Sequence, residues 1–352
     1  MNAAPTFPTT LVDELWRVRR RWLVTGVAGF IGSHLLETLL ALDQEVVGLD
    51  DLSTGSRANL EDVRARAGEK RWESFRFHHA DIRSLEATRE AARDVDVILH
   101  QAALGSVPRS IENPLETHSV NVLGTVNVLE AARHEGRPRV VYASSSAVYG
   151  DDSRLPKVED RRGRPLSPYA ASKVAGELAA DAHAHSYGLE VLGLRYFNVF
   201  GPRQRPDGPY AAVVPRWIEA FIQDHPVVIY GDGRTSRDFC YVANTVQANL
   251  LAALTREPGA VGSVVNVAVG GRTSLTELFE KIRRRVARVV PRAGSRKPVH
   301  EPFRPGDVPH SEADISRAER LLGYRPSHDL ERGLDETVAW FLEAVGTGSI
   351  GV

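Results

Sequence analysis

Three glycines spaced three residues apart constrain the fold of this chain more than any other feature. They lie between a short apolar segment, residues 21–25, and a segment with the apolar periodicity of a helix, residues 33–42. In a strand–loop–helix unit, Gly26 permits the tight turn, and Gly29 lets backbone N–H groups approach a pyrophosphate at the helix N-terminus. Gly32 lets the helix pack closely on the strand. The pattern predicts a dinucleotide-binding loop.

The next two predicted strands each end in an acidic residue. Asp50 closes the strand at residues 45–50, 18 residues after Gly32. A carboxylate at about this separation binds the adenosine ribose hydroxyls and repels a 2′-phosphate, so we expect NAD rather than NADP. Asp81 closes the strand at residues 75–81, and we expect Asp81 and Ile82 to meet the adenine edge.

Short strands and helices alternate up to residue 150, which predicts an α/β fold of the Rossmann type with a doubly wound parallel sheet. We expect an N-terminal extension at 1–20, peripheral to the fold, and an NAD-binding domain at 21–195. Residues 53–74 are expected to be an irregular, charged excursion. After 195 the chain is richer in loops, and we assign 196–352 mainly to a smaller α/β C-terminal lobe that binds substrate, with segments interleaved with the first domain. A strand near 264–269 is placed in this part of the chain.

A tyrosine and a lysine lie on one face of a predicted helix. Tyr169 and Lys173 are four residues apart, which brings their side chains together on a helix. A nearby ammonium favours the phenolate and lowers the pKa of a tyrosine from its usual value of about 10. Ser145 ends the preceding strand, at the same carboxyl edge of the sheet. The tyrosine and the lysine together predict a general base, and the serine is delivered to the same edge.

The composition limits the classes of function. The 352 residues carry a net charge of −1, which gives no reason to expect a nucleic acid partner. The single cysteine, Cys240, excludes an internal disulfide and fits a reducing compartment, so we expect a cytoplasmic protein. No apolar run approaches the length of a membrane span. No metal site is expected.

Taken together, these elements resemble the extended short-chain dehydrogenase/reductase family. The matching residues occur in the order of the family and cover about 21–345: the glycine loop, Asp50, Asp81-Ile82, Ser144-Ser145, Tyr169-x-x-x-Lys173 and Arg195-Tyr-Phe-Asn198. Within the family, the chain looks like the nucleotide-sugar 4-epimerases. The segments 100–110 and 231–241 are similar to those of bacterial UDP-N-acetylglucosamine 4-epimerases, which supply polysaccharide and O-antigen precursors.

The resemblance implies a role for each matching residue. Tyr169 is the base, Lys173 its partner and a ligand of the nicotinamide ribose, and Ser145 the third catalytic group. A tightly bound NAD, regenerated in each turnover, is implied to contact Gly26, Gly29, Phe30, Ile31, Gly32, Asp50, Asp81, Ile82, Gln101, Ala102, Ala103, Asn121, Tyr169, Lys173 and Tyr196. The UDP-sugar is implied to contact Gly105, Ser106, Ser145, Ser146, Asn198, Gln204, Ala212, Val213, Arg237, Arg304, Asp307 and Ser311.

Small residues near the expected sugar site suggest the substrate. Ser311 stands where relatives restricted to non-acetylated sugars have a tyrosine, and Gly105 and Ser106 lie on the loop expected to face the sugar. We hypothesise that the resulting space accepts an N-acetyl group at C2, with Gln204 as a partner of the amide. The expected reaction is interconversion of UDP-GlcNAc and UDP-GalNAc through a transient 4-keto sugar.

Other functions remain open at this point. A UDP-glucose/UDP-galactose or UDP-glucuronate 4-epimerase, or a decarboxylating relative, would use the same catalytic residues. A non-catalytic NAD-sensing scaffold would keep the glycine loop without needing the tyrosine and the lysine. The family resemblance also implies a homodimer, joined by a four-helix bundle from helices at about 114–134 and 166–187.

Overall fold

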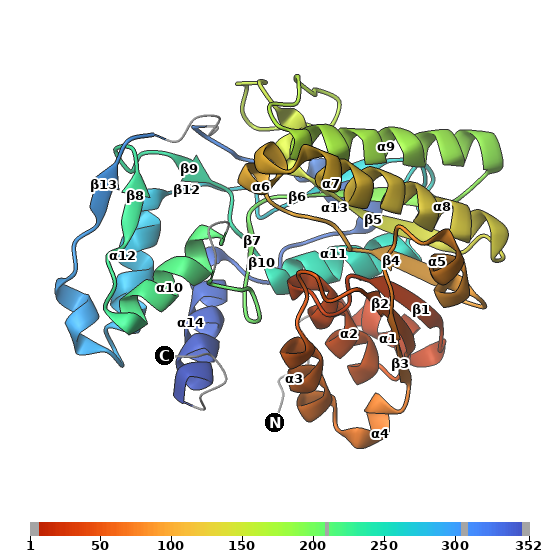
Figure 1. Cartoon of the computed structure of the whole chain (residues 1–352), viewed down its shortest axis with the longest axis horizontal. Helices are drawn as coiled ribbons and strands as arrows, with labels where there is room; N and C mark the ends of the chain where they lie inside the picture. The colour runs from red at the N-terminus through yellow and green to blue at the C-terminus, as the bar shows by residue number, and fades with distance from the viewer. Residues whose placement is uncertain (1–6, 208–210, 304–308, 347–352) are drawn as a thin grey trace.

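The computed structural model describes residues 7–207, 211–303 and 309–346. Figure 1 shows a larger lobe built on a central sheet and a smaller lobe beside it that carries α10, α12 and α14. Along the chain the two lobes alternate after residue 196, since segments from the C-terminal half return to the larger lobe. Among the described residues, none of the helices combines the length and the apolar character that crossing a bilayer requires.

The central sheet is parallel throughout and has seven strands in the order β11-β6-β5-β4-β1-β2-β3. This order reverses direction at β1, as in doubly wound nucleotide-binding folds, so the crevice at the carboxyl ends of β1 and β4 is the expected ligand site. The predicted fold class is confirmed. The strands are β1 (Arg21–Thr25), β2 (Glu45–Asp50), β3 (Phe75–His79), β4 (Val97–His100), β5 (Arg139–Ser145), β6 (Val191–Tyr196) and β11 (Val264–Val267).

Both faces of this sheet are buried, because alternate strand residues pack into two separate apolar clusters. Trp22 and Val24 of β1 contact one cluster, whereas Leu23 between them contacts the other. The first cluster is covered by α1 (Thr9–Arg17), α2 (Phe30–Ala41), α3 (Arg57–Ala67), α11 (Val242–Leu254) and α13 (Ser316–Leu322). The second is covered by α5 (Leu85–Ala92), α8 (Gly124–His134) and α9 (Pro168–Tyr187).

The helix that carries the tyrosine and the lysine begins with a strong local start signal. The hydroxyl of Ser167 accepts a hydrogen bond from the backbone N–H of Ala170, and Pro168 occupies the first turn. The helix ends at Gly188, whose left-handed conformation is typical of a helix C-terminus. Helix α9 therefore spans the range that the sequence predicted. Before it lie α6 (Val107–Glu112), α7 (Pro114–His118), a π-helical turn (Ser119–Leu123) and a 3₁₀ turn (Ser146–Tyr149).

The smaller lobe has its own apolar core between helices and short strand pairs. Its helices are α10 (Val213–Gln223), α12 (Leu275–Val286) and α14 (Leu330–Gly346), and a 3₁₀ turn lies at Pro291–Ser295. The strand pairs are β8 (Val228–Tyr230) with β13 (Val299–Glu301), β9 (Ser236–Arg237) with β12 (Thr273–Ser274), and β7 (Val199–Phe200) with β10 (Cys240–Tyr241).

Three expectations about the chain need correction. Residues 53–74 are not irregular, because they contain α3 and the short helix α4 (Glu69–Trp72). The strand expected in the C-terminal part belongs to the central sheet, where β11 pairs with β6. The N-terminal helix is not peripheral: Leu11 and Leu15 are buried against the first cluster, and the Leu15 carbonyl accepts a hydrogen bond from the side chain of Gln44. The placements of β11 and of the N-terminal helix depend on long-range packing, whereas α3 has a local start signal, since the Ser56 hydroxyl accepts a hydrogen bond from the N–H of Ala58.

Candidate active site

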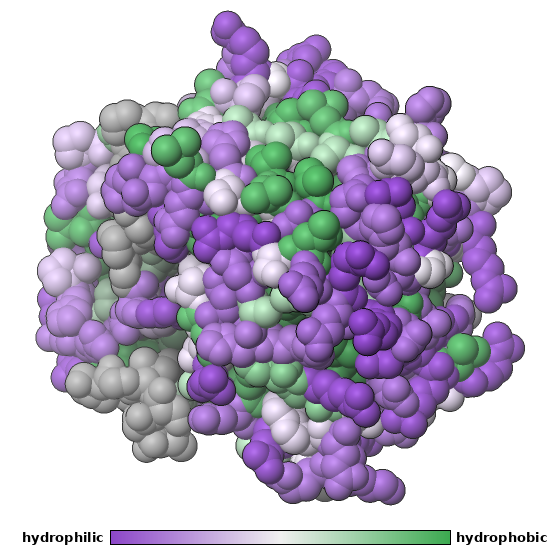
Figure 2. All heavy atoms as spheres, turned by 45° about the vertical axis from the view of Figure 1, so that its right-hand side comes forward, coloured by the Kyte–Doolittle hydropathy of each residue, from purple (hydrophilic) through white to green (hydrophobic). Residues whose placement is uncertain are grey.

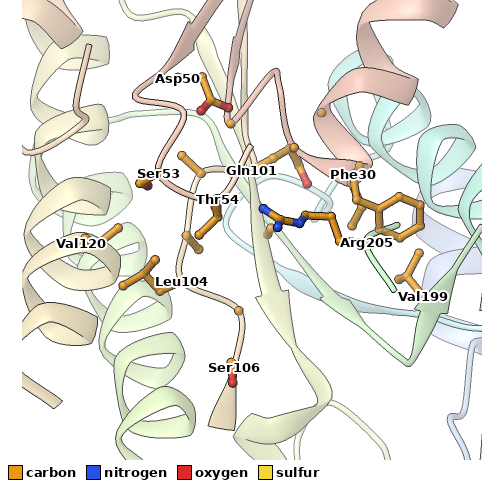
Figure 3. A pocket seen from close by; sticks show the side chains of 18 of the residues that line it. Phe30, Asp50, Ser53, Thr54, Gln101, Leu104, Ser106, Val120, Val199 and Arg205 are labelled. Atoms are coloured by element: carbon orange, nitrogen blue, oxygen red, sulfur yellow. The ribbon is translucent and has the colours of Figure 1, made fainter. Parts of the chain in front are cut away.

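A cleft of about 690 Å³ lies at the carboxyl ends of the central strands. Figure 3 shows side chains from both sides of this cleft, among them Asp50, Gln101, Leu104 and Ser106. Most residues predicted for cofactor and substrate line it: Gly26, Gly29, Phe30, Ile31, Gly32, Asp50, Asp81, Ile82, Gln101, Ala102, Ala103, Gly105, Ser106, Ser145, Ser146, Tyr169, Lys173, Tyr196, Asn198, Gln204 and Ala212.

The glycine loop has the close geometry that a dinucleotide pyrophosphate requires. Gly26 has a φ of +69°, and a Cβ there would lie 2.7 Å from the backbone nitrogen of Ala102. A Cβ on Gly32 would lie 2.0 Å from the carbonyl oxygen of Gly26. Helix α2 begins immediately after Gly29, so its unpaired N–H groups face the cleft. The residues present therefore fit a bound dinucleotide.

Asp50 lies at the end of β2, and its carboxylate is held by the loops around it. Its oxygens accept hydrogen bonds from the backbone N–H groups of Ala28 (2.9 Å) and Leu52 (2.8 Å). Burial raises the pKa of Asp50, and these two hydrogen bonds oppose the rise. Asp81, on the neighbouring strand end, is fixed by the guanidinium group of Arg83, which lowers its pKa. Both carboxylates are thus positioned before a ligand binds.

A hydrogen-bonded trio orients the predicted cofactor residues Gln101 and Tyr196. The Tyr196 hydroxyl donates to Oε1 of Gln101 at 3.0 Å, and Nδ2 of Asn249 donates to the Tyr196 oxygen at 2.8 Å. Nε2 of Gln101 donates to Oδ1 of Asn249 at 3.0 Å, which closes the ring. Asn249 comes from α11, far along the chain, and was not predicted from the sequence.

Ser145, Tyr169 and Lys173 meet at the edge of the sheet. Nζ of Lys173 lies 6.0 Å from the centre of the Tyr169 ring and donates to the Ala143 carbonyl at 2.9 Å. Burial lowers the pKa of Lys173 to about 8, and the carboxylate of Glu177 opposes this change. Burial raises the pKa of Tyr169, whereas its hydrogen bond with Ser145 favours the phenolate. In the chain alone, desolvation is the larger influence on the Tyr169 pKa, so the expected lowering of this pKa stays a prediction for the chain with its cofactor bound.

A buried charged network lies behind these residues. Glu177 follows Lys173 by one helical turn, and both its oxygens accept from Arg195, at 2.9 and 2.8 Å. The hydroxyl of Ser144 donates to the same carboxylate at 2.5 Å. The network ties α9 to β5 and β6, so it fixes Tyr169 relative to Ser145, the neighbour of Ser144. The Tyr-x-x-x-Lys-x-x-x-Glu spacing in the sequence could have identified Glu177.

The predicted sugar side of the cleft contains open space and, among the described residues, an acceptor without a hydrogen-bond partner. A Cβ on Gly105 would meet no atom within 4 Å. Gln204 donates through Nε2 to the Val199 carbonyl, while its Oε1 atom is buried without a hydrogen-bond partner among the described residues. Asn198 has a φ of +33° and donates from its side chain to the Asp238 carbonyl at 3.0 Å. A buried carbonyl oxygen without a donor is costly, so Gln204 is suited to bind a ligand N–H.

Four residues predicted for ligand contact are not among those that line the cleft. Asn121 instead holds the loop after β4, since its side chain hydrogen-bonds both the N–H and the carbonyl of Leu104. Val213 packs against the core of the smaller lobe. Arg237 donates to the carbonyls of Ser236 and Pro309, and Ser311 is buried. The predicted Arg304 and Asp307 lie outside the described residues.

Several cleft residues were missed from the sequence. Ser53, Thr54 and Asn59 follow β2, while Arg203 and Arg205 belong to the segment after β7. The Gly201-Pro-Arg-Gln-Arg205 run marks a turn with cations, but nothing local indicates that it reaches the nucleotide-binding side.

Comparisons with known proteins agree with this geometry. The model of the NAD dependent epimerase/dehydratase family matches residues 22–268. A UDP-glucose 4-epimerase of Mycolicibacterium smegmatis is 40% identical over 323 residues, which are 91% of this chain and 98% of the relative. A solved UDP-N-acetylglucosamine 4-epimerase from Methanobrevibacter ruminantium M1, in complex with UDP-N-acetylmuramic acid, is 37% identical with a TM-score of 0.83, covering 92% of this chain and 99% of that one. A UDP-glucuronic acid 4-epimerase from Bacillus cereus, solved with UDP-glucuronic acid and NAD, is 30% identical with a TM-score of 0.82 and the same coverage.

Proposed function

Since the chain belongs to the NAD-dependent epimerase/dehydratase family, we propose that it inverts C4 of a UDP-sugar and that its preferred pair is UDP-GlcNAc and UDP-GalNAc. The observation that carries the choice of sugar is Gln204, a residue that lines the cleft and whose buried Oε1 atom has no donor among the described residues. An acetamido N–H at C2 would supply that donor. The open space at Gly105 adds room for the acetyl group.

The chain's own residues would handle the protons and the orientation of the sugar. When bound, NAD⁺ supplies the acceptor and later the donor of the hydride at C4. Tyr169 takes the proton of the 4-hydroxyl group, and the hydrogen bond with Ser145 favours its phenolate. Once Tyr169 has taken the proton, the single O–H of Ser145 can donate to the 4-oxygen of the keto sugar instead. Because burial opposes ionisation of Tyr169, we expect the positive nicotinamide and Lys173 together to stabilise the phenolate.

A direct assay tests this proposal. Purified protein is incubated with UDP-GlcNAc without added reductant, and UDP-GalNAc is measured by chromatography. The ratio kcat/KM is then compared for UDP-GlcNAc, UDP-Glc and UDP-glucuronate. A clear preference for UDP-Glc would reject the choice of sugar, and no turnover of any UDP-sugar would favour the non-catalytic NAD-sensing scaffold.

Two substitutions examine the basis of the preference. Gln204→Leu removes the acceptor oxygen and keeps a side chain of similar size. We expect kcat/KM for UDP-GlcNAc to fall about tenfold, whereas kcat/KM for UDP-Glc should change little. Ser311→Tyr tests the more distant position and is expected to impair acetylated substrates first. An equal loss with both sugars in the Gln204 variant would contradict amide recognition.

UDP-glucuronate is the second candidate substrate, because Arg109 lines the cleft beside Ser106. Arg109 pairs with Glu116 at 3.6 Å, a long contact that a sugar C6 carboxylate could replace. A higher kcat/KM for UDP-glucuronate than for UDP-GlcNAc, lost in Arg109→Gln, would favour this alternative.

We also propose a homodimer through α7, the π-helical turn, α8 and α9. Large apolar side chains are exposed there: Leu115, Leu123 and Leu178. Figure 2 shows apolar atoms among hydrophilic ones on the upper part of this face. Exposed apolar groups that lie close together are typical of protein interfaces. Light scattering after size-exclusion chromatography measures the mass, and a monomer would reject this assembly.

A further inference from the structure

The segment Gly201–Asp207 leaves the smaller lobe and is fixed to the nucleotide-binding side by one buried arginine. Nη2 of Arg203 lies 2.5 Å from a carboxylate oxygen of Glu37 on α2, and Nη1 lies 3.3 Å from Asp62 on α3. The Arg203 side chain is almost completely buried. Removing one partner from a buried ion pair is costly, so this contact holds the segment in place.

A histidine on α2 completes the anchor. Nη2 of Arg203 donates to Nδ1 of His34 at 2.8 Å, which leaves the proton of the neutral ring on Nε2. Nε2 then donates to the carbonyl of Pro202 at 2.9 Å. Burial, together with the charge of Arg203, holds the pKa of His34 well below its usual value. Helix α2 is the helix that begins at the glycine loop, so the segment is attached to the predicted pyrophosphate site.

Arg205 extends from this anchored segment into the cleft. In Figure 3 its side chain extends into the cleft, with the guanidinium group between Phe30, the first residue of α2, and Thr54. Its described ion-pair partner is Asp207, at 2.7 Å, and both side chains are more than half exposed. An exposed pair of this kind contributes little to stability, so a ligand anion can replace the carboxylate.

The negative charges around the cleft favour a cation at the position of the Arg205 guanidinium group. Three carboxylates line the nucleotide side: Asp50, Asp51 and Asp81. A dinucleotide pyrophosphate carries two negative charges, and the glycine loop provides N–H groups but no full positive charge. Among the described residues lining the cleft, the other cations have different partners: Lys173 is beside Tyr169, Arg203 is in the anchor, and Arg109 pairs with Glu116.

We propose that Gly201–Asp207 is a strap over the cofactor cleft, in which Arg203 is the anchor and Arg205 binds the pyrophosphate of NAD. The strap links the two lobes directly through the cofactor, so it would retain NAD between turnovers. This role depends on the cofactor and not on which sugar the enzyme accepts.

The test measures NAD retention rather than turnover. Arg205→Ala is compared with the unchanged protein for its NAD content after gel filtration and for the rate of NADH release, followed by fluorescence. A hydrogen bond to a charged group contributes enough that its loss should accelerate release about ten- to a hundredfold. Arg205→Lys should restore part of the retention, and higher salt should accelerate release more in the unchanged protein than in Arg205→Ala.

Arg234→Ala is the matched control, because Arg234 is also an exposed arginine near an aspartate two residues away, Asp232, and it does not line the cleft. We expect NAD retention unchanged in this variant. Equal NADH release in Arg205→Ala and Arg234→Ala would overturn the proposal. A raised KM for the UDP-sugar with unchanged NADH release would overturn it as well, because Arg205 would then bind the diphosphate of the substrate.

Discussion

The predicted nucleotide side and the predicted sugar side of the cleft are built in different ways. On the nucleotide side, the functional groups lie at the ends of adjacent parallel strands and on the loops that follow directly. On the predicted sugar side, the cleft is completed by Gln204 and Ala212, and the sequence neighbours of Ala212 belong to the smaller lobe. The first arrangement follows from the sheet itself, whereas the second requires two lobes to pack correctly. Substitutions should therefore have separable effects on the two sides.

Tyr169→Phe should have the largest effect, because we expect it to abolish most turnover while NAD binding is kept. The substitution removes the hydroxyl of the proposed general base, so we expect kcat to fall about 10²- to 10⁴-fold. The ring is kept, and NAD content after gel filtration should stay unchanged. Turnover is measured as conversion of UDP-GlcNAc. Near-normal turnover would refute the catalytic assignment, and loss of NAD would show that the two sides are not separable at this residue.

Glu177→Ala tests the rigidity of the nucleotide side. The substitution leaves Arg195 buried without its carboxylate, so the free energy of unfolding should fall by about 3–5 kcal/mol. Glu130→Ala is the control on the adjacent helix, where the carboxylate pairs with Arg133 and His183 at a partly exposed site. Its loss should cost about 1 kcal/mol or less. Chemical denaturation gives both values, and similar losses in the two variants would contradict a special role for the buried network.

Most residues predicted for the nucleotide side do line the cleft, because the relevant geometry is local. Glycine spacing, an acid at a strand end and a capped helix each fix backbone within a few residues. Parallel strands then bring Gly26, Asp50, Gln101 and Ser145 to one edge without further information. Asn121 is an exception on this side. An asparagine at its place in the helix can bind either a ligand or the backbone of a neighbouring loop, and Asn121 binds the Leu104 backbone.

The sugar side was predicted less completely because its contacts join distant segments. The anchor of the strap on the nucleotide side has the same limit, because Arg203 meets Glu37 across 166 residues of chain and no local pattern specifies that pairing. Arg237 and Ser311 lie on neighbouring segments through the bridge that joins Ser236 to His310, but they lie outside the lining of the cleft. Residue type alone suggested their chemistry, whereas their position depends on how the smaller lobe folds.

Lys173 provides a smaller test, through the dependence of stability on pH. Its pKa is lowered to about 8 in the folded chain, below its value in the unfolded chain. Above about pH 8 the unfolded chain binds more protons at this site, so the contribution of Lys173 to stability increases with pH. Between about pH 8 and pH 9 the free energy of unfolding should rise by about 1 kcal/mol relative to Lys173→Met. Identical pH dependence in the two proteins would contradict the lowered pKa.

Asn198 should give the smallest effect, and it lies where β6 leaves the sheet for the sugar side. With a φ of +33°, the backbone there favours glycine or asparagine, so Asn198→Ala should be about 1 kcal/mol less stable than Asn198→Gly. Both variants lose the side-chain amide, and if it holds the sugar diphosphate, both should raise the KM for the UDP-sugar about equally. NAD retention should be unchanged in both. If the KM for the UDP-sugar rises only in the alanine variant, backbone strain is the cause and the amide does not bind substrate. If both variants lose NAD, the two sides of the cleft are coupled at this residue, and substitutions here do not have separable effects on them.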